Sequence, residues 1–434
     1  MDLRATEGVA SRFKAYIEHL RNAVGHADRR EPLAAYCAGL LLPGERKSVE
    51  PMAARLAPEE VSAKHQSLHH FVAKAPWEEA ALLGAVRNFV LPKIEEAAPI
   101  RAWIIDDTGI PKKGKHSVGV ARQYCGELGK QDNCQVAVTL SVASDQASLP
   151  IAFQLYLPES WASDTERRRK VGVPDEIQFK TKPQIALDQF RQAIADSVPQ
   201  GVVLADAGYG NDTAFRTGLS ELGLAYVVGV QGSTAVWEPG TAPQPAKPWS
   251  GQGRPPKLLR REGEKPVKVS DLAKALPRKA WKTVRWREGT GGALVSRFAV
   301  VRVRPSHRDT WRAEPWPEEW LLMEWPETEE APAKFWLSTL PANTTLRDLV
   351  DTAKLRWRIE RDFQDLKQEI GLDHYEGRGW RGFHHHAALS IAAYGFLVAE
   401  RSPIPPSRPF FQAFFAQTPV RNETYRPRGA AAPA

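Results

Sequence analysis

The chain has 434 residues, 42% of them hydrophobic, which is enough for two or three globular domains with real cores. Its 59 lysines and arginines exceed its 51 aspartates and glutamates by eight, and this excess favours a polyanionic partner. No run of about 18 apolar residues occurs, so the composition excludes a membrane-spanning helix and we expect no membrane partner.

The start of the chain and its cysteines bear on the cellular compartment. Residues 1–7 lack the apolar core of a signal peptide, so we expect no export by the usual route. Cys37, Cys125 and Cys134 do not make a metal-binding quartet, and the last two can form at most one disulfide. A reducing, cytoplasmic location fits this cysteine content best.

Residues 8–98 have the pattern of short helices separated by brief breaks, and the expected helices are 11–24, 32–41, 48–56, 58–71 and 77–91. Basic residues in the connections are compatible with a helical DNA-binding domain over residues 1–98. A helical cap that packs on the next domain explains the same pattern equally well. His65, His69 and His70 have no recognisable set of metal-binding partners, so we interpret them as helix surface or DNA contacts.

A buried strand that ends in two acids follows. Residues 102–108 form an apolar run that carries Asp106 and Asp107 ahead of a Gly- and Lys-rich loop, 109–116. Carboxylates at the end of a buried strand are costly unless they are paired or bind a metal. The connection from residue 112 to 130 is basic and rich in glycine, which suits backbone approach to phosphate. Its candidate DNA contacts are Lys112, Lys113, Lys115 and Arg122.

An apolar strand that ends in an acid occurs a second time, at Asp206 in the run Leu-Ala-Asp-Ala-Gly-Tyr-Gly. We expect strands at 135–142, 150–157, 201–206 and 225–230 and helices at 182–197 and 212–222. The order of three strands, helix, strand, helix and strand predicts a mixed α/β sheet over residues 99–230.

Residues 231–341 differ in composition from the preceding part, because nine of the 14 tryptophans fall there together with many prolines and arginines. Strand patterns such as 296–303 predict a mainly β insertion. Its first part, 240–266, is a loop rich in Pro, Gly, Lys and Arg. Aromatic rings interleaved with arginines can stack on unpaired bases, whereas the simpler interpretation is that most of these tryptophans fill a small β core.

The most unusual pattern is a long helix that begins at Thr344 or Thr345 and ends at Gly371. At about 100° per residue, Arg356 and Lys367 lie within about 40° of Glu360, so a carboxylate and two cations share one helix face. The simpler explanation of such a trio is a surface salt-bridge ladder. The acids on the two upstream strands favour a functional explanation.

Residues 342–401 hold this helix and a final helix, 383–400. Residues 384–386 are three histidines at the start of the final helix, where neighbouring side chains point in different directions, so we do not expect a metal site there. Residues 402–434 are Pro-rich, and we expect a disordered tail.

Asp106, Asp206 and Glu360 are the acids with the clearest chemical meaning. Asp106 and Asp206 each stand at the end of a strand, and Glu360 lies on a helix that can pack across the same sheet. Phosphodiester hydrolysis or transfer uses a pair of metal ions, and Mg²⁺ prefers hard oxygen ligands, with Mn²⁺ as a substitute. The pattern predicts a site for two Mg²⁺ ions, with Asp107 as the alternative to Asp106.

With these residues the chain resembles bacterial insertion-sequence transposases of the DDE class, which have an RNase H-like catalytic core. In one branch of that class, the helix with the catalytic glutamate carries a spaced signature of Tyr, Arg, Glu and Lys. Arg356, Glu360 and Lys367 match this signature, and Ala353 stands at the tyrosine position. The resemblance covers roughly residues 30–400.

The resemblance implies that Asp106, Asp206 and Glu360 bind metal and are catalytic. The first aspartate of the branch commonly has a hydroxyl residue two positions on, and Thr108 fits that register. The β insertion before the glutamate also matches the branch. The implied fold is an RNase H-like mixed sheet flanked by helices, with a mainly β insertion and an N-terminal helical domain.

The activity implied is Mg²⁺-dependent DNA cleavage and strand transfer, with transposon ends and target DNA as partners and a homodimer assembled on DNA. A catalytically silent DNA-binding regulator and a metal-dependent nuclease are the alternatives. Relatives of this kind can cut the second strand through a hairpin in which a flipped base stacks on an aromatic ring. Trp357 lies about 60° around the helix from Glu360 and is the candidate ring, whereas Trp336 lies in an apolar run and is expected in the core.

Overall fold

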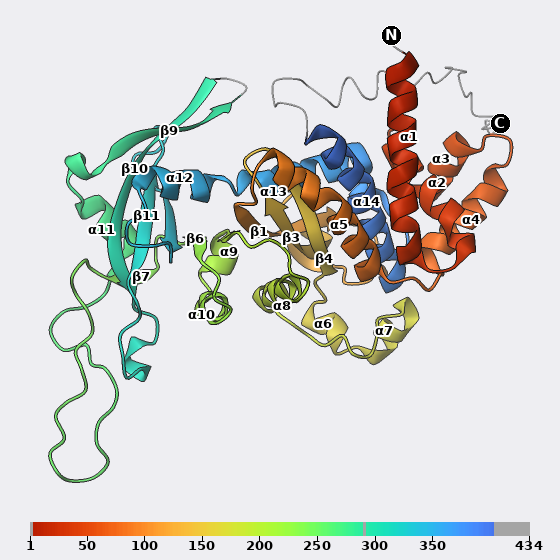
Figure 1. Ribbon diagram of the computed structural model, residues 1–434. Helices are drawn as coiled ribbons and strands as arrows, with labels where there is room; N and C mark the ends of the chain where they lie inside the picture. The colour runs from red at the N-terminus through yellow and green to blue at the C-terminus, as the bar shows by residue number, and fades with distance from the viewer. Residues whose placement is uncertain (1–2, 290–291, 403–434) are drawn as a thin grey trace, which may run out of the picture.

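The structure, a computed structural model, describes residues 3–289 and 292–402. N-terminal helices, a central α/β body and a β-rich insertion follow one another across the molecule (Figure 1). The tail predicted at 402–434 lies outside the described residues, apart from Ser402. Within the described ranges, no helix is long and apolar enough to cross a membrane.

The N-terminal part is helical, as the sequence predicts. In chain order its helices are α1 (Leu3–Leu20), η1 (Arg21–Val24), η2 (Ala27–Arg29), α2 (Arg30–Leu41), α3 (Val49–Leu56), α4 (Val61–Ala73) and α5 (Glu79–Ala97). Its hydrophobic core is continuous with that of the central body, because Tyr16, Leu40 and Val90 belong to one cluster with Trp103 of the sheet. A shared core therefore crosses the expected boundary at residue 98, and a separate domain over 1–98 stays a prediction.

The central body has the strand order β4-β3-β1-β5-β6, and this arrangement confirms the RNase H-like mixed sheet. Strands β1, β3 and β4 are antiparallel neighbours, while β5 and β6 run parallel to β1. The strands are β1 (Ala102–Pro111), β3 (Lys130–Ala143), β4 (Ser148–Leu155), β5 (Val202–Ala205) and β6 (Tyr226–Val230), and the main helices between them are α8 (Lys182–Ala195) and α10 (Thr213–Glu221).

The segment 112–130, expected as a loop, contains a strand. β2 (Ala121–Cys125) forms a hairpin with β3, because the turn after Cys125 closes through Gly129 at φ 62°. β1 also extends through Pro111 into the expected loop 109–116. The short helices α6 (Glu159–Ala162) and α7 (Thr165–Val171) precede α8.

The insertion continues the same sheet. β12 (Lys334–Ser338) pairs antiparallel with β6, and β11 (Glu319–Trp325) and β10 (Gly292–Pro305) follow, so 12 strands form one sheet. The remaining elements of the insertion are β7 (Ala235–Trp237), β8 (Val267–Lys268), α11 (Val269–Ala275), η3 (Arg278–Ala280), β9 (Lys282–Gly289) and η4 (Asp309–Trp311).

The tryptophans of the insertion line its surface more than they fill its core. Trp237 is buried, whereas Trp249 and Trp311 are exposed and the other six are half-buried. Arginines lie over several of the rings, for example Arg297 at 3.9 Å from the ring centre of Trp325. The simple core-filling interpretation therefore holds fully for Trp237 alone among the nine.

The long helix expected from Thr344 or Thr345 to Gly371 is divided into three pieces. They are α12 (Leu346–Lys354), α13 (Trp357–Asp365) and the π-helical η5 (Leu366–Ile370). The predicted ends are confirmed, because the Thr345 hydroxyl accepts a hydrogen bond from the Asp348 N–H and Gly371 stops the helix at φ 83°. The prediction of one continuous helix is therefore correct at both ends and wrong at its middle, where the helix is interrupted.

The division falls at Leu355 and Arg356, where the helix tightens. The N–H groups of Arg358 and Ile359 donate to carbonyl oxygens three residues back instead of four. Val350 of α12 and Ile359 of α13 share one core with strands of both the insertion and the central body, and only η5 packs into the other large core. The change of core therefore comes at η5, after the break.

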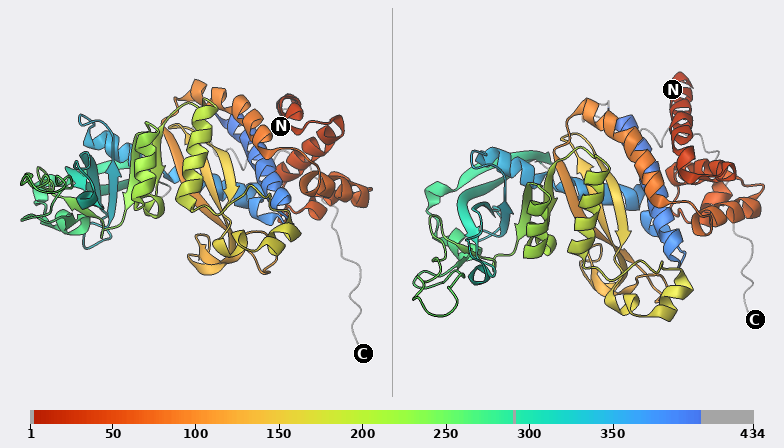
Figure 2. Two further views of the ribbon diagram at one scale, coloured as in Figure 1. Left: turned by 90° about the horizontal axis from the view of Figure 1, so that it is seen from below. Right: turned by 60° about the horizontal axis from the view of Figure 1, so that its bottom comes forward.

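α14 (Trp380–Arg401), preceded by η6 (Leu372–His374), is buried along most of its length and lies beside α5 (Figure 2). Its three adjacent histidines contact different parts of the fold. His384 accepts from the Leu155 N–H, His385 contacts Val72 O and Trp77 O, and His386 contacts the Tyr36 hydroxyl and Gly371 O. These side chains fasten α14 to its neighbours.

Candidate active site

β1 directs its two adjacent acids to opposite faces of the sheet, because side chains alternate along a strand. The Asp107 carboxylate lies 2.7 Å from Lys182 Nζ of α8. The Asp106 carboxylate lies 2.6 Å from Arg356 Nη1, directly before α13. Asp106 is therefore the acid on the face that also carries Glu360.

Asp206 follows β5 at the position that corresponds to Asp106. β1 and β5 are parallel with Ala102 opposite Val202, so extending this register places Asp206 beside Asp106. Asp206 Oδ1 accepts hydrogen bonds from Gly208 N at 2.9 Å and Tyr209 N at 3.3 Å. These bonds cap the short helix α9 (Ala207–Gly210) and hold the carboxylate at the strand end.

Small residues after Asp206 let α9 pack tightly on β6. A Cβ on Gly210 would lie 1.9 Å from the carbonyl oxygen of Gly229, and a Cβ on Gly229 would lie 3.0 Å from Ala207 N. No side chain fits at residue 210 with this spacing. The Ala-Gly-Tyr-Gly run therefore has a packing role that fixes the backbone beside Asp206.

Arg356 bridges two of the three predicted acids. One terminal nitrogen of its guanidinium contacts Asp106 and the other contacts Glu360. The Glu360 side chain is 58% exposed, whereas the Asp106 side chain is 16% exposed. The site therefore has an inner acid on the sheet and an outer acid on the helix, joined by one cation.

Burial raises the pKa of the Asp106 carboxyl to about 7; Arg356 lowers it, and Asp206 and Asp107 raise it. Both neighbouring acids therefore act electrostatically on Asp106, although Asp107 lies on the opposite face of the sheet. Grouped acids with a perturbed pKa at a strand end are typical of functional sites.

A cleft of about 370 Å³ opens beside these residues, between the central body and the insertion. The central body contributes Asp206, Arg356, Trp357 and Glu360, and the insertion contributes Trp286 and Trp336 among others. Ala353, at the position of the signature tyrosine, lines the same cleft. The cleft therefore has acids and a guanidinium at one side and indole rings at the other.

Trp357 and Trp336 both line the cleft. The guanidinium of Arg287 lies 4.1 Å from the ring centre of Trp357. Trp336, expected in the core, is half-buried: Leu337 beside it belongs to the core under α11, and Trp336 packs on the other side of β12. Side chains of β12 alternate between the two faces of the sheet, so Trp336 is partly exposed although its apolar neighbours led us to expect it in the core.

The basic residues predicted to contact DNA fall into two groups. Lys367 Nζ lies 2.7 Å from Gly109 O and 2.7 Å from Glu127, close to the end of β1. Lys112 is half-buried and donates to Tyr375 O at 2.8 Å. The exposed group consists of Lys113, Lys115 and Arg122.

Sequence reasoning missed two cations that lie over the indole rings beside the cleft. Lys354 Nζ lies 2.6 Å from Glu324 and 4.6 Å from the ring centre of Trp286, and burial lowers the pKa of this lysine. Arg287 reaches Trp357 from β9. No spacing in the sequence connects β9 with α12, so only the fold reveals this group.

The donor set suits Mg²⁺ in its chemistry, because carboxylate oxygens are hard ligands. In the described part of the chain, however, no three His, Cys, Asp or Glu side chains are grouped closely enough to hold a metal ion. The carboxylates have partners within the protein instead. Arg356 takes oxygens of both Asp106 and Glu360, and Asp206 uses one oxygen as a helix cap.

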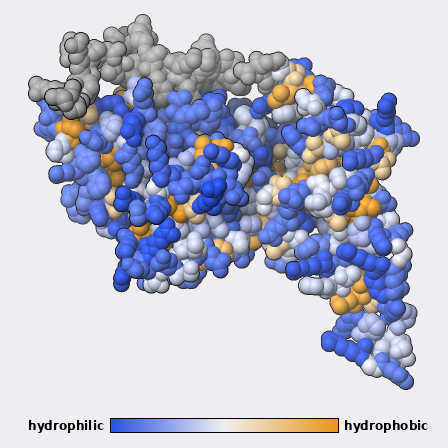
Figure 3. Space-filling model, turned by 180° about the vertical axis from the view of Figure 1, so that it is seen from behind, coloured by the Kyte–Doolittle hydropathy of each residue, from blue (hydrophilic) through white to orange (hydrophobic). Residues whose placement is uncertain are grey.

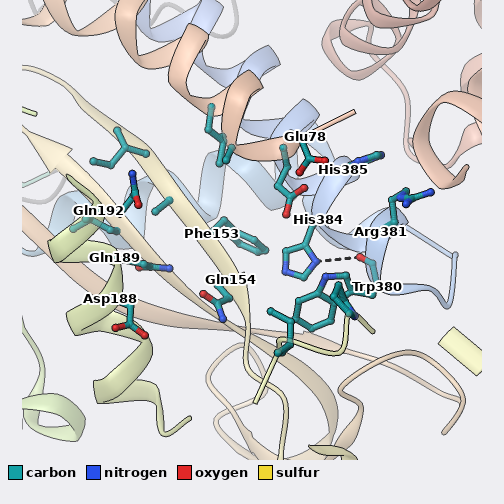
Figure 4. A pocket seen from close by; sticks show the side chains of 18 of the residues that line it. Glu78, Phe153, Gln154, Asp188, Gln189, Gln192, Trp380, Arg381, His384 and His385 are labelled. Atoms are coloured by element: carbon teal, nitrogen blue, oxygen red, sulfur yellow. Dashed lines mark hydrogen bonds between the residues drawn. The ribbon is translucent and has the colours of Figure 1, made fainter. Parts of the chain in front are cut away.

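A larger cavity, of about 640 Å³, lies on the opposite face of the sheet (Figure 4). Leu140 of β3 and Gln189 of α8 line it, and Gln189 donates to the backbone of Val138, the cross-strand neighbour of Asp107. Five acids and two arginines face this cavity. Such a lining repels phosphate, so the smaller cleft is the better candidate for chemistry on nucleic acid.

Two comparisons with known proteins bear on this geometry. The chain is 34% identical over 167 residues to a protein described as "Probable transposase for insertion sequence element IS701" from Microchaete diplosiphon. The aligned part covers 38% of this chain and 40% of that relative, so it spans less than half the relative's length. Residues 19–293, more than half of the chain, match the family described as DDE superfamily endonuclease. The chain therefore belongs to the DDE superfamily endonucleases.

Proposed function

We propose that the protein is a DNA transposase that binds the terminal inverted repeats of an insertion sequence and catalyses Mg²⁺-dependent strand cleavage and strand transfer. One observation carries this proposal: Arg356 joins Asp106 to Glu360 at the mouth of a cleft that Asp206 also lines. Membership of the endonuclease family and similarity to a probable transposase support it.

Asp106, Asp206 and Glu360 would hold two Mg²⁺ ions, for which Mn²⁺ is the substitute. Such ions activate the attacking oxygen and stabilise the leaving oxygen of a phosphodiester. Metal binding by this set requires Arg356 to release its two carboxylates. The freed guanidinium is then placed to bind a phosphate oxygen of DNA with two parallel hydrogen bonds.

The other cleft residues have roles in positioning DNA. Lys367, held near the end of β1, gives a second cation on the Glu360 face. Trp357 offers a ring on which a flipped base stacks during second-strand cleavage. Lys113, Lys115 and Arg122 are exposed and bind backbone phosphates, with a smaller contribution from the half-buried Lys112.

The parts of the chain divide this work. Residues 1–98 bind the transposon ends, residues 99–230 and 342–401 form the catalytic core, and residues 231–341 form the insertion that completes the cleft. Double-stranded transposon ends and target DNA are the partners, and two copies assemble on the DNA so that both ends are cut in one complex. The reaction is cut-and-paste transposition.

The test is cleavage of duplex DNA that carries the terminal repeats of the element, with and without Mg²⁺. Specific nicking at the repeat ends that needs Mg²⁺, followed by joining to target DNA, is the expected result. Specific binding without cleavage would identify a silent regulator. Cleavage of any duplex without end preference or joining would identify a nuclease.

A further inference from the structure

The insertion carries an arm, residues 245–258, that has no regular structure and is exposed along nearly all of its length. It forms the end of the long loop that extends from the insertion beyond β7 (Figure 1). Figure 3 shows this part of the molecule as a protrusion at the lower right, with hydrophilic residues over much of its surface. The arm contains Lys247, Arg254 and Lys257, four prolines and no acid.

The base of the arm is firmly anchored. Gln244 and Arg260 exchange two backbone hydrogen bonds of 2.8 Å, and the Leu259 N–H donates to Arg312 O at 2.9 Å. Arg261 contacts the buried carboxylate of Asp309 at 2.8 Å. A fixed base with a projecting end presents the arm in one direction.

The tip of the arm is a turn closed by a tryptophan. The Trp249 indole N–H lies 3.3 Å from Gln252 O and 3.2 Å from Gly253 O, while its ring is exposed. Gly251 and Gly253 have φ of +85° and +73°, and a Cβ on either would meet no atom within 4 Å. The turn therefore needs glycine for its backbone conformation, and its outer side is empty.

Arg254 follows this turn, and its guanidinium is exposed. Within the ranges that the structure describes, neither Arg254 nor Lys257 makes an ion pair or a side-chain hydrogen bond, and both are exposed. Pro255 disfavours helical backbone at Arg254, and Pro255 and Pro256 have no N–H that needs a partner. The segment is thus a narrow strip without regular structure that carries one central guanidinium.

A strip of this kind fits the minor groove of DNA. That groove is about 6 Å wide, and in A·T tracts it is narrower and more negative, which attracts an inserted arginine. Glycines permit close backbone approach, and an arginine can donate to the acceptors on adenine and thymine edges. In G·C pairs the amino group of guanine occupies the groove floor.

We propose that the arm reads the minor groove of A·T-rich duplex DNA, with Arg254 inserted in the groove and Lys247 and Lys257 on the flanking phosphates. This inference rests on the proposed function, since it gives the arm a place on the DNA that the enzyme cuts. The arm lies away from α13 (Figure 1), so the tract that it contacts is not the one at the catalytic acids.

The experiment measures binding of the full chain to three duplexes of equal length, with A·T, G·C or inosine·cytosine tracts, at several salt concentrations. Inosine·cytosine pairs present the minor groove of A·T and the major groove of G·C. We expect the A·T and inosine·cytosine duplexes to bind about tenfold more tightly than the G·C duplex. Arg254→Gln removes this preference.

Arg278→Gln is the matched control, because Arg278 is an exposed arginine of the insertion outside the arm. It loses the same charge and should weaken binding to all three duplexes equally. Equal affinities of the wild type for the three duplexes, a preference that survives Arg254→Gln, or an inosine·cytosine duplex that behaves like G·C would each overturn the proposal. So would tighter binding of single strands that depends on Trp249.

The same preparations are assayed for cleavage of terminal-repeat DNA. If the wild type cleaves terminal-repeat DNA but shows no groove preference, the proposal for the arm is rejected and the proposed function stands. If the wild type prefers A·T-rich DNA, Arg254→Gln loses this preference and the wild type cleaves no DNA, the proposal for the arm is supported and the proposed function is rejected.

Discussion

The two faces of the core sheet are built for different purposes, although they share the same strands. On one face Asp106 meets Arg356, and a cleft of about 370 Å³ opens towards the insertion. On the other face Asp107 pairs with Lys182 of α8, and helices cover the sheet around the larger, acid-lined cavity. Two adjacent acids therefore differ in their surroundings because a strand alternates, and one residue of register decides which of them faces Arg356 and the cleft.

The covered face also contains polar groups, and several of them have a partner in the fold. His386 is completely packed between Tyr36 and Gly371, and Gln189 bonds to the backbone of β3. On the open face Glu360 is largely exposed, and Asp106 and Glu360 share the guanidinium of Arg356 between them. Polar groups with permanent partners stabilise a fold, whereas groups with exchangeable partners are suited to bind a ligand.

The largest effect on cleavage is expected when the two acids of β1 are replaced one at a time. Asp106→Asn removes a proposed metal ligand and should lower strand cleavage at least about 1,000-fold. Asp107→Asn loses a partner of Lys182 on the covered face and should retain most of the cleavage activity. Both variants are compared on the same terminal-repeat duplex, with DNA binding as the control. The reverse order of effects would transfer the catalytic role to Asp107.

The buried histidines on the covered face should make the stability of the protein depend on pH. Burial lowers the pKa of His386 to about 4, and its neutral ring can accept from the Tyr36 hydroxyl while donating to Gly371 O. Because the unfolded pKa is about 6.5, this stabilisation is fully present above pH 6.5 and is lost as the pH falls through 4. His386→Gln should remove up to about 3 kcal/mol of this pH dependence.

Denaturant unfolding between pH 4 and pH 7 measures the difference. His70→Gln is the control, because His70 is an exposed histidine on α4 and its replacement should leave the pH dependence unchanged. If His386→Gln and the wild type lost stability in parallel on acidification, His386 would not be held neutral by the fold.

The contact between α9 and β6 can be broken with one methyl group. Gly210→Ala places a Cβ 1.9 Å from Gly229 O and should lower the free energy of unfolding by about 2 kcal/mol. Gly84→Ala is the control, since the nearest atom to its Cβ lies at 3.9 Å on a helix surface. Thermal unfolding of both variants is the measurement. An unchanged melting temperature for Gly210→Ala would show that α9 is not fixed by this contact.

The smallest effect is expected at the ring of the open face. Trp357→Ala should fold normally and nick the first strand, while second-strand processing slows by about tenfold or more through loss of base stacking. Gel analysis of the two cleavage products separates these steps. Trp336→Ala, which changes a ring on the opposite wall, is the comparison. Equal rates of both cuts in Trp357→Ala would return this tryptophan to a structural role.

Much of this organisation could be predicted from local patterns. A strand that ends in an acid, and a helix with an acid and two cations on one face, are short-range signals, so Asp106, Asp206 and Glu360 could be chosen before any contact was known. The catalytic role of these residues stays a prediction. The mixed sheet and the helical N-terminal part followed from the same kind of pattern and are confirmed.

Other features depend on contacts between distant segments, and sequence reasoning did not find them. The break at Leu355 has no proline or glycine to mark it. Arg287 meets Trp357 only because β9 is carried to the cleft by the sheet. The hairpin of β2 was missed because its turn glycines were read as a loop for phosphate.

The antiparallel pairing of β12 with β6 has a mechanical consequence. Four residue pairs, from Phe335 opposite Val230 to Ser338 opposite Val227, join the insertion to the central body through backbone hydrogen bonds. A hinge motion of the insertion would have to break this ladder, at a cost that a flexible linker does not impose. The ladder therefore ties the insertion to the central body, and under the proposed function a duplex that enters the cleft meets the insertion as the wall opposite the acids.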